Sequence, residues 1–178
     1  MLISASSCQS DPSKTSHTVA DSSKSSKFLY DSAGHIIPKP SGYINDYVML
    51  FSPGQRDSLE NLISGFEKNT KIEIAVICFS RVMLENDSLE TVTVRYANTW
   101  GVGKKGKNNG VTIGICPELR KMTIRNGFGI EKVLSDSETK KIIAEAFLPS
   151  YGKAAYFKGT LNGLKVLMYT LERKFNFD

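Results

Sequence analysis

The stretch GVTIGICPELRKMTIRNG, from Gly110 to Gly127, decides how this chain folds. Two runs rich in β-branched residues flank the short segment PELR, a pattern that predicts two strands joined by a tight turn. If the turn is centred on residues 117–120, Cys116 pairs close to Lys121, and Gly110 lies close to Gly127. We therefore expect an antiparallel hairpin whose open ends meet at one edge of a sheet.

The segments before this hairpin alternate between helix and strand patterns. SPGQRDSLENLISGFEKNT predicts a helix, because Ser52 and Gln55 fit a capping box and apolar residues then recur at helical spacing. KIEIAVICFS, at residues 71–80, is a nearly continuous apolar run and predicts a strand covered on both faces. NDSLETVTVRYANTW predicts a second helix with Asp87 as its N-cap.

Two further helices follow the hairpin. SDSETKKIIAEAFLPSYG repeats the capping box with Ser135 and Glu138, and we expect Pro149 to end this helix. The last helix carries an apolar stripe of Phe157, Leu161, Leu164, Met168 and Leu171. The order is strand, helix, strand, helix, hairpin, helix, helix. This order predicts the α/β class: a three-layer α/β/α sandwich with a small mixed sheet of about four strands and helices on both faces.

Composition narrows the possible functions. The net charge is +5, but the lysines are scattered and the arginines form no cluster, so we expect no nucleic-acid partner. Both histidines, His17 and His35, precede the expected domain, which removes histidine from catalysis and zinc binding in the folded part. Cys78 and Cys116 lie in apolar runs and suit small buried side chains, with a disulfide between them as the less favoured alternative.

Residues 1–41 are rich in Ser and Lys and poor in large apolar residues, so we expect a disordered tether before a domain at 42–174 and a short tail at 175–178. LISASSC resembles the end of a bacterial lipoprotein signal, in which Cys8 would carry lipid. Two explanations fit: a start codon placed late with a lipidated Cys8, or an ordinary cysteine in a polar tail. No run of 18 apolar residues occurs, so we expect no membrane-spanning helix.

The glycine-rich stretch WGVGKKGKNNG precedes the hairpin. A phosphate-binding loop runs from a strand into a helix, whose N-terminus supplies free amides, but this stretch runs from a helix into a strand. Gly101 or Gly103 is better explained as a helix C-cap, and Lys104 and Lys105 suit the negative end of that helix.

The hairpin brings KGKNNG and NGFGIEKVLSD together at one edge of the sheet. Asn108, Asn109, Glu131 and Asp136 would then lie close to one another, and their carboxylate and carboxamide oxygens are ligands for calcium or magnesium. The helix start at Ser135 and Asp136 also aims amides there, which suits an anion. The alternative is that Asp136 stabilises its own helix, Glu131 is a solvated loop residue, and Asn-Gly is turn chemistry.

Four stretches, taken together and in this order, resemble the TPM domain: GYINDYVMLFSPGQRDSLENLI, WGVGKKGKNNGVTIGI, RKMTIRNGFGIEKVLSD and LPSYGKAAYFKGTLNGLKVLM. The resemblance covers Gly42 to Leu171. That family includes a thylakoid lumen protein, a photosystem II repair factor, an acetylcholine-receptor modulator of the MOLO type and many bacterial envelope proteins.

The resemblance implies an α/β/α sandwich on the non-cytoplasmic side of a membrane, usually with a membrane anchor. Members are described as binding divalent metals, some as weak acid phosphatases, and others as acting through protein partners. The polar motif positions carried over are Asn45, Asp46, Asn108, Asn109, Arg125, Glu131 and Asp136. Where the family usually has Asp-Asn-Gly, this chain has Asn108-Asn109-Gly110, which removes one negative charge from the loop.

These observations lead us to expect a cell-envelope accessory domain that binds a divalent cation, calcium or magnesium, and acts through a protein partner. The expected metal ligands are Asp46, Asn108, Asn109, Glu131 and Asp136, with Arg125 as an anion contact. The alternatives are a weak metal-dependent acid phosphatase, in which Asp46, Glu131 and Asp136 hold the metal, and a structural spacer. We expect a periplasmic or membrane-tethered location, with a lipid on Cys8 as the only anchor.

Overall fold

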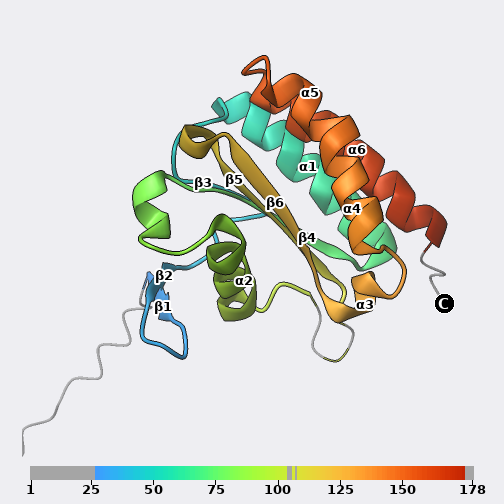
Figure 1. The fold of residues 1–178 in the computed structure, drawn as a ribbon. Coiled ribbons are helices and arrows are strands. Elements are labelled where there is room, and N and C mark those ends of the chain that lie inside the picture. The colour runs from blue at the N-terminus through green and yellow to red at the C-terminus, as the bar shows by residue number, and fades with distance from the viewer. Residues whose placement is uncertain (1–26, 104–105, 107, 175–178) are drawn as a thin grey trace, which may run out of the picture.

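The computed structural model describes residues 27–103, 106 and 108–174. Its centre is a four-stranded mixed sheet in the order β3-β4-β5-β6, and helices cover both faces of this sheet (Figure 1). The predicted α/β sandwich is therefore confirmed. Cys8, Lys104, Lys105 and the tail at 175–178 lie outside the described residues.

The hairpin has the register that the sequence predicts. The strands of the sheet are β3 (Ile44–Asp46), β4 (Glu73–Cys78), β5 (Gly110–Cys116) and β6 (Lys121–Asn126). The first three run parallel to one another, and β6 is antiparallel to β5. Cys116 lies opposite Lys121, and the Gly127 N–H donates to the Gly110 carbonyl at 2.8 Å. The chain reverses through a short 3₁₀ turn, η2 (Pro117–Leu119).

One face of the sheet is covered by α1 (Pro53–Thr70), α4 (Asp136–Ile142) and α6 (Tyr156–Lys174) (Figure 1). As predicted, α1 begins with a capping box, in which Ser52 and Gln55 exchange hydrogen bonds. The apolar side chains of this layer form the larger hydrophobic cluster, which we call the first core. Its fully buried members include Leu59, Ile63, Ile74, Val76, Ile113 and Leu164.

The helix after the hairpin is longer than expected. α4 continues into a π-helical segment, Ile143–Phe147, and then into α5 (Leu148–Tyr151), so Pro149 does not end it. Pro149 stands in the first turn of α5, where a missing N–H disturbs no α-helical bond, and the wider π turn leads into it. Phe147 is fully buried against Gly163, where an added Cβ would come within 2.2 Å of the ring.

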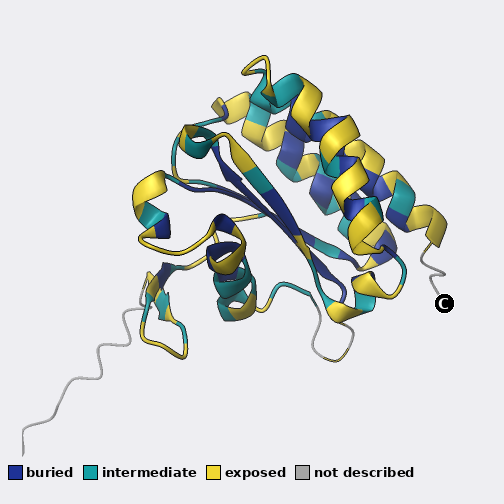
Figure 2. Cartoon of the chain, viewed as in Figure 1, coloured by how far each residue is buried: buried dark blue, intermediate teal, exposed yellow. Residues whose placement is uncertain are grey.

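The other face is covered by α2 (Leu89–Trp100) and by the loop that precedes it, which contains the 3₁₀ helix η1 (Arg81–Leu84). The apolar residues on this side form a smaller cluster, which we call the second core. Its members are Ile37, Ile77, Phe79, Leu84, Leu89, Val92, Tyr96 and Cys116. Figure 2 shows the strands buried between the two layers.

The ends of α2 differ in one detail from the prediction. Ser88, rather than Asp87, is the N-cap: its hydroxyl accepts from the Thr91 N–H at 3.1 Å. Asp87 is instead paired with Arg95. Gly101, in a left-handed conformation at φ 69°, ends the helix as expected.

The second core includes a segment that was predicted to be a tether. β1 (Phe28–Tyr30) and β2 (Ile36–Pro38) form an antiparallel hairpin, so the expected disordered region of residues 1–41 is wrong in its last part. Ile37 is only 1% exposed, and the Trp100 Nε1–H donates to the Pro38 carbonyl at 2.8 Å. Each strand has three residues, which is too short for alternation to indicate a buried face.

The two parallel crossovers have opposite hands. The connections β3-α1-β4 and β4-α2-β5 step in the same direction across the sheet, yet α1 and α2 lie on opposite faces (Figure 1). One of the two is therefore left-handed, against the strong right-handed preference of such units. As a result, the chain leads from β3 to α1 on the first face of the sheet and from β4 to α2 on the second.

The cysteines of the sheet are free and buried. Cys78 belongs to the first core and Cys116 to the second, so the sheet separates them and the disulfide alternative is wrong. Burial raises the pKa of the Cys78 thiol well above its ordinary value, and Asp46 adds to this effect. Within the described part of the chain, none of the helices combines the length and apolar character needed to cross a membrane.

Candidate functional site

The two loops predicted to meet do meet, at the end of the sheet where β5 begins and β6 ends. The Gly129 N–H donates to the Asn108 carbonyl at 3.0 Å. A Cβ at Gly127 would lie 2.4 Å from the same carbonyl oxygen, so only glycine permits this approach. We call the polar residues here the amino-end rim. Its members are Asn108, Asn109, Asn126, Glu131 and Asp136.

The two asparagines of the first loop have different environments. Asn109 is 2% exposed, and its Nδ2 donates to the Lys71 carbonyl at 2.5 Å. Its own carbonyl accepts from the Glu73 N–H at 3.3 Å. Asn109 therefore fixes the start of β5 to the start of β4. Asn108 is exposed at φ 48°, a left-handed conformation that asparagine tolerates.

The two carboxylates of the rim are exposed. Glu131 ends the short helix α3 (Phe128–Glu131), and Asp136 is the first residue of α4. Asp136 is well placed to interact with the positive end of its own helix. Across residues 27–103, 106 and 108–174, no group of three or more His, Cys, Asp or Glu side chains is arranged to hold a metal ion. The rim thus offers two carboxylates and several amide oxygens.

Asn126 is a rim residue that was not predicted from the sequence. Its Nδ2 donates to the Thr139 hydroxyl at 2.9 Å, and that hydroxyl donates to the Ser135 carbonyl at 3.0 Å. Its Oδ1 is buried without a hydrogen-bond partner among the described residues. A buried acceptor without a partner indicates a place for a ligand or a water. The hairpin register, which puts Asn126 opposite Val111, was the signal that could have found it.

Asp46 does not join the rim. It lies opposite Cys78 at the carboxyl ends of β3 and β4, whereas Asn109 and Glu73 lie at the amino ends of the parallel strands. Its carboxylate accepts from the backbone N–H groups of Val48 at 3.2 Å, Leu50 at 3.0 Å and Phe51 at 2.9 Å. The predicted set of five metal ligands is therefore split between opposite ends of the sheet.

Arg125 also lies apart from the rim carboxylates. It is exposed on β6 opposite Thr112. Side chains alternate along a strand, and Ile124 belongs to the first core, so Arg125 faces the layer of α2. α4, which carries Asp136, packs on the other face. The structure does not bring Arg125 together with Asp136 as an anion site.

The opposite end of the sheet carries exposed apolar side chains. Met49 is 90% exposed at φ 54°, and Val82 is 83% exposed in η1 after the neighbouring strand. The Tyr47 ring is partly exposed and packs edge-on against Tyr96, with ring centroids 6.5 Å apart. Burial, and then the neighbouring Tyr96, raise the pKa of Tyr47 to about 12. We call Tyr47, Met49 and Val82 the carboxyl-end surface.

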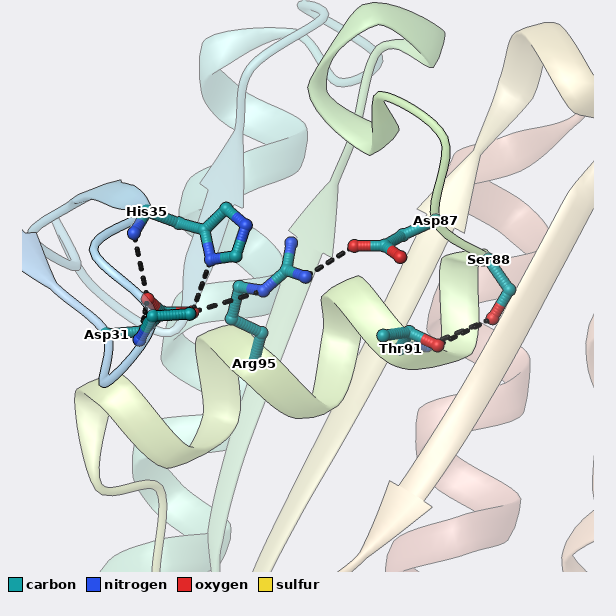
Figure 3. Close-up of polar contacts among 7 residues, drawn as sticks. Asp31, His35, Asp87, Ser88, Thr91 and Arg95 are labelled. Atoms are coloured by element: carbon teal, nitrogen blue, oxygen red, sulfur yellow. Dashed lines mark hydrogen bonds and ion pairs between the residues drawn. The ribbon is translucent and has the colours of Figure 1, made fainter.

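A third polar group joins the N-terminal hairpin to α2 (Figure 3). Asp31 lies 2.7 Å from His35 Nδ1 and 3.2 Å from Arg95 Nε, and Arg95 also pairs with Asp87. Desolvation acts to raise the pKa of Asp31, but hydrogen bonds from His35 and Ala33 outweigh it and lower the pKa. His35 thus belongs to the described fold, contrary to the prediction that both histidines precede it.

The sequence matches a known protein family over most of this architecture. The model of the TPM domain matches residues 44–170, a span that contains the whole four-stranded sheet. The chain belongs to the TPM domain family. The N-terminal hairpin, at residues 28–38, lies before the matched span of this TPM domain. A search of curated proteins finds no match.

Solved structures show the same fold. The N-terminal domain of a P. gingivalis protein is 24% identical, with a TM-score of 0.67 over 74% of this chain and 82% of that chain. BA42 from Bizionia argentinensis is 18% identical, with a TM-score of 0.64 over 74% of this chain and 88% of that chain. The N-terminal domain of cg2496 from Corynebacterium glutamicum is 15% identical, with a TM-score of 0.55 over 73% and 80%.

Proposed function

We propose that this TPM domain is an accessory domain of the cell envelope that acts by binding a protein partner at the carboxyl-end surface. The observation that carries the proposal is Met49, a large apolar side chain that is 90% exposed on a residue in a left-handed conformation. Such a conformation is strained for a residue other than glycine, and strained residues cluster at functional sites. Exposed apolar groups that are held in place suit a protein interface.

The loop around Met49 is held in this shape by Asp46. The three backbone N–H groups that donate hydrogen bonds to the Asp46 carboxylate lie on both sides of Met49 in the sequence. A loop fixed in advance loses little entropy on binding, which favours affinity. Val82 is a second exposed apolar side chain at this end of the sheet, in η1 after the adjacent strand β4. The Arg81 N–H donates to Glu118 Oε1 at 3.3 Å, which ties η1 to the hairpin turn.

Site-specific photocrosslinking in cells of the source organism tests this proposal. A photoreactive amino acid replaces Met49, Val82 or, as the control, Tyr169, which is 59% exposed on α6. We expect a discrete protein adduct at positions 49 and 82 and none at 169. The adduct at position 82 should disappear in a Met49→Asp background. Equal adducts at all three positions, or none at 49 and 82, would contradict the proposal.

A divalent cation, calcium or magnesium, at the amino-end rim is a second proposal. The buried Oδ1 of Asn126 without a partner favours it, because oxygen ligands from amides and carboxylates suit hard cations. Glu131 and Asp136 supply the negative charge of the rim. Titration with calcium or magnesium, followed by amide chemical shifts, should move Asn126 and its neighbours, and the shifts should vanish in a Glu131→Gln, Asp136→Asn variant. Glu172→Gln, at an exposed position on α6, is the control.

The phosphatase alternative has weaker support. It requires Asp46, Glu131 and Asp136 around one metal, and the first lies at the opposite end of the sheet from the other two. The thiol of Cys78 is fully buried with a raised pKa, so it makes a poor nucleophile at that end. Hydrolysis of a chromogenic phosphate ester that is lost in Asp46→Ala would reverse this ranking.

The cellular location is also a proposal. A periplasmic or membrane-tethered domain fits the TPM family likeness, and a lipid on Cys8 would supply the tether. Mass spectrometry of the protein from a membrane fraction, expressed with its upstream region, tests this directly. A lipid adduct on Cys8 would support the tether, and an unmodified Cys8 would exclude it.

A further inference from the structure

A groove separates the N-terminal hairpin from α2. It has a volume of about 520 Å³, within the range of small-molecule sites. Tyr30, Asp31 and Ser32 line it from the hairpin side. The hairpin lies before the residues that the TPM family model matches, so one side of the groove is built outside the matched span.

The charged side chains that line the groove, Asp31 and Arg95, are already paired. The Arg95 guanidinium contacts both Asp31 and Asp87, and Asp31 also contacts His35 (Figure 3). An anionic ligand would have to compete with two carboxylates for one guanidinium, and a cationic ligand would compete with Arg95 and His35 for Asp31. The groove is therefore suited to an uncharged polar ligand.

The walls of the groove offer hydrogen bonds that the protein does not use. The side chains of Ser32, Asn98 and Thr99 line it and make no hydrogen bond to other described residues. Hydroxyl groups both donate and accept, and a carboxamide does both in one plane. Such groups match a ligand with several hydroxyl groups.

An aromatic ring stands at the same groove. Tyr30 is 65% exposed, which leaves its ring available to a ligand. A pyranose ring has one face of C–H groups that packs on an aromatic ring and a rim of hydroxyl groups that hydrogen-bond. Val94 is the one aliphatic residue of the lining, so a purely apolar ligand would gain little there.

We propose that this groove binds carbohydrate, namely a neutral pyranose unit of a glycan. Tyr30 stacks on the sugar ring, while Asn98 and Ser32 hydrogen-bond to its hydroxyl groups. The Asp31–Arg95 pair holds the hairpin against α2 and so keeps the two walls at a fixed separation.

A titration of the full chain with defined sugars tests the proposal. The probes are chitohexaose, cellohexaose and maltohexaose, and the control is sorbitol, which has hydroxyl groups but no ring. We expect saturable amide shifts in residues 28–38 and 91–99 with at least one oligosaccharide, with a Kd of about 1 mM or lower, and none with sorbitol. A groove that merely collects polar solutes would respond to sorbitol as well, and that result overturns the proposal.

Variants separate the groove from general surface binding. Tyr30→Ala and Asn98→Ala, both at exposed positions, should weaken binding about tenfold each. Tyr169→Ala, a tyrosine of similar exposure on α6, should bind like the unmodified chain. Wild-type affinity in Tyr30→Ala, shifts outside the groove, or no saturable shift with any of the three oligosaccharides would each overturn the proposal. The experiment contains no protein partner, so its outcome is independent of the carboxyl-end surface.

Discussion

The two faces of the sheet are covered in different ways. On the first face, α1, α4 and α6 pack together, and α1 and α6 each bring an apolar stripe to the first core. On the second face, α2 is joined by a two-stranded hairpin from far upstream, which contributes one fully buried side chain, Ile37. The first layer, apart from the last residues of α6, lies within the span that the TPM model matches, while the hairpin precedes it.

This difference shows how a short hairpin can complete a core. The hairpin could not fold alone, because two strands of three residues bury too little surface to offset their ordering entropy. It is held by Ile37, by the Trp100–Pro38 hydrogen bond and by the Asp31–Arg95 pair. The second layer should therefore open locally before the first.

The largest expected effect is on the first core. Phe147→Ala removes a fully buried ring that fills the space above Gly163, and it should lower the free energy of unfolding by about 3–5 kcal/mol. Urea denaturation measures this loss. Leu148→Ala, at a neighbouring position that is 42% exposed, is the control and should change little. A loss below about 1 kcal/mol for Phe147→Ala would show that the first core can collapse around the gap.

The next effect tests whether the hairpin is part of the fold. Ile37→Ala should cost about 2 kcal/mol, near the low end for a buried isoleucine, because the hairpin can detach instead of leaving a rigid cavity. Ile36→Ala, one residue away and 62% exposed, should be close to neutral. Thermal unfolding and hydrogen exchange of residues 28–38 provide the measurement. If both variants behave alike, the segment is a tether after all.

Much of the first layer and of the sheet was predictable from sequence. The capping boxes at Ser52 and Ser135 mark helix starts, and the apolar run at 71–80 marks a central strand. The PELR turn fixed the register of β5 and β6, and with it the meeting of the two glycine loops. These signals are local or span one turn, so each could be read without knowing the rest of the fold.

The second layer and the sites were harder to predict. One buried side chain in the β1-β2 hairpin gives no periodic pattern, and the cluster that it joins is formed by residues at least 40 positions away in the sequence. Asp46 stands at the end of a strand, a position where catalytic carboxylates are often found. Its oxygens instead accept hydrogen bonds from backbone N–H groups of its own loop, and the sequence does not reveal these bonds. The strained loop at Met49 has no sequence signature either, because its shape depends on those same hydrogen bonds.

A smaller effect is expected from the charged pair that joins the hairpin to α2. Arg95→Met keeps the aliphatic stem but removes both ion pairs, so hydrogen exchange in residues 28–38 should accelerate about fivefold. Lys174→Met, which removes the ion pair with Glu138 on the first face, should leave this exchange unchanged. An equal acceleration in both variants would mean that the hairpin reports global unfolding rather than its own release.

The smallest expected effect is the loss of stability at acidic pH, which should occur at different pH values on the two faces of the sheet. A carboxyl whose pKa is lowered on folding stabilises the fold above its ordinary pKa, and this contribution is lost as the pH falls. The ordinary pKa of an aspartate such as Asp31 is 3.8, and folding lowers it. Protonation of Asp31 should therefore weaken the attachment of the hairpin progressively as the pH drops below about 4. Hydrogen bonds from Lys174, and to a lesser extent from Ser135, lower the pKa of Glu138 from 4.5 to about 2. Its contribution to stability is therefore lost as the pH falls from 4.5 to about 2.

Amide shifts followed from pH 7 downward measure both events in one titration. The His35 and Ala33 amides, which donate to Asp31, should move together with protection of the hairpin. The Ser135 amide, which donates to Glu138 at 3.1 Å, should move at lower pH without affecting the hairpin. Asp31→Asn should flatten the hairpin curve and leave the Ser135 curve in place. A hairpin that keeps the same acid response in Asp31→Asn would show that another group holds it to α2.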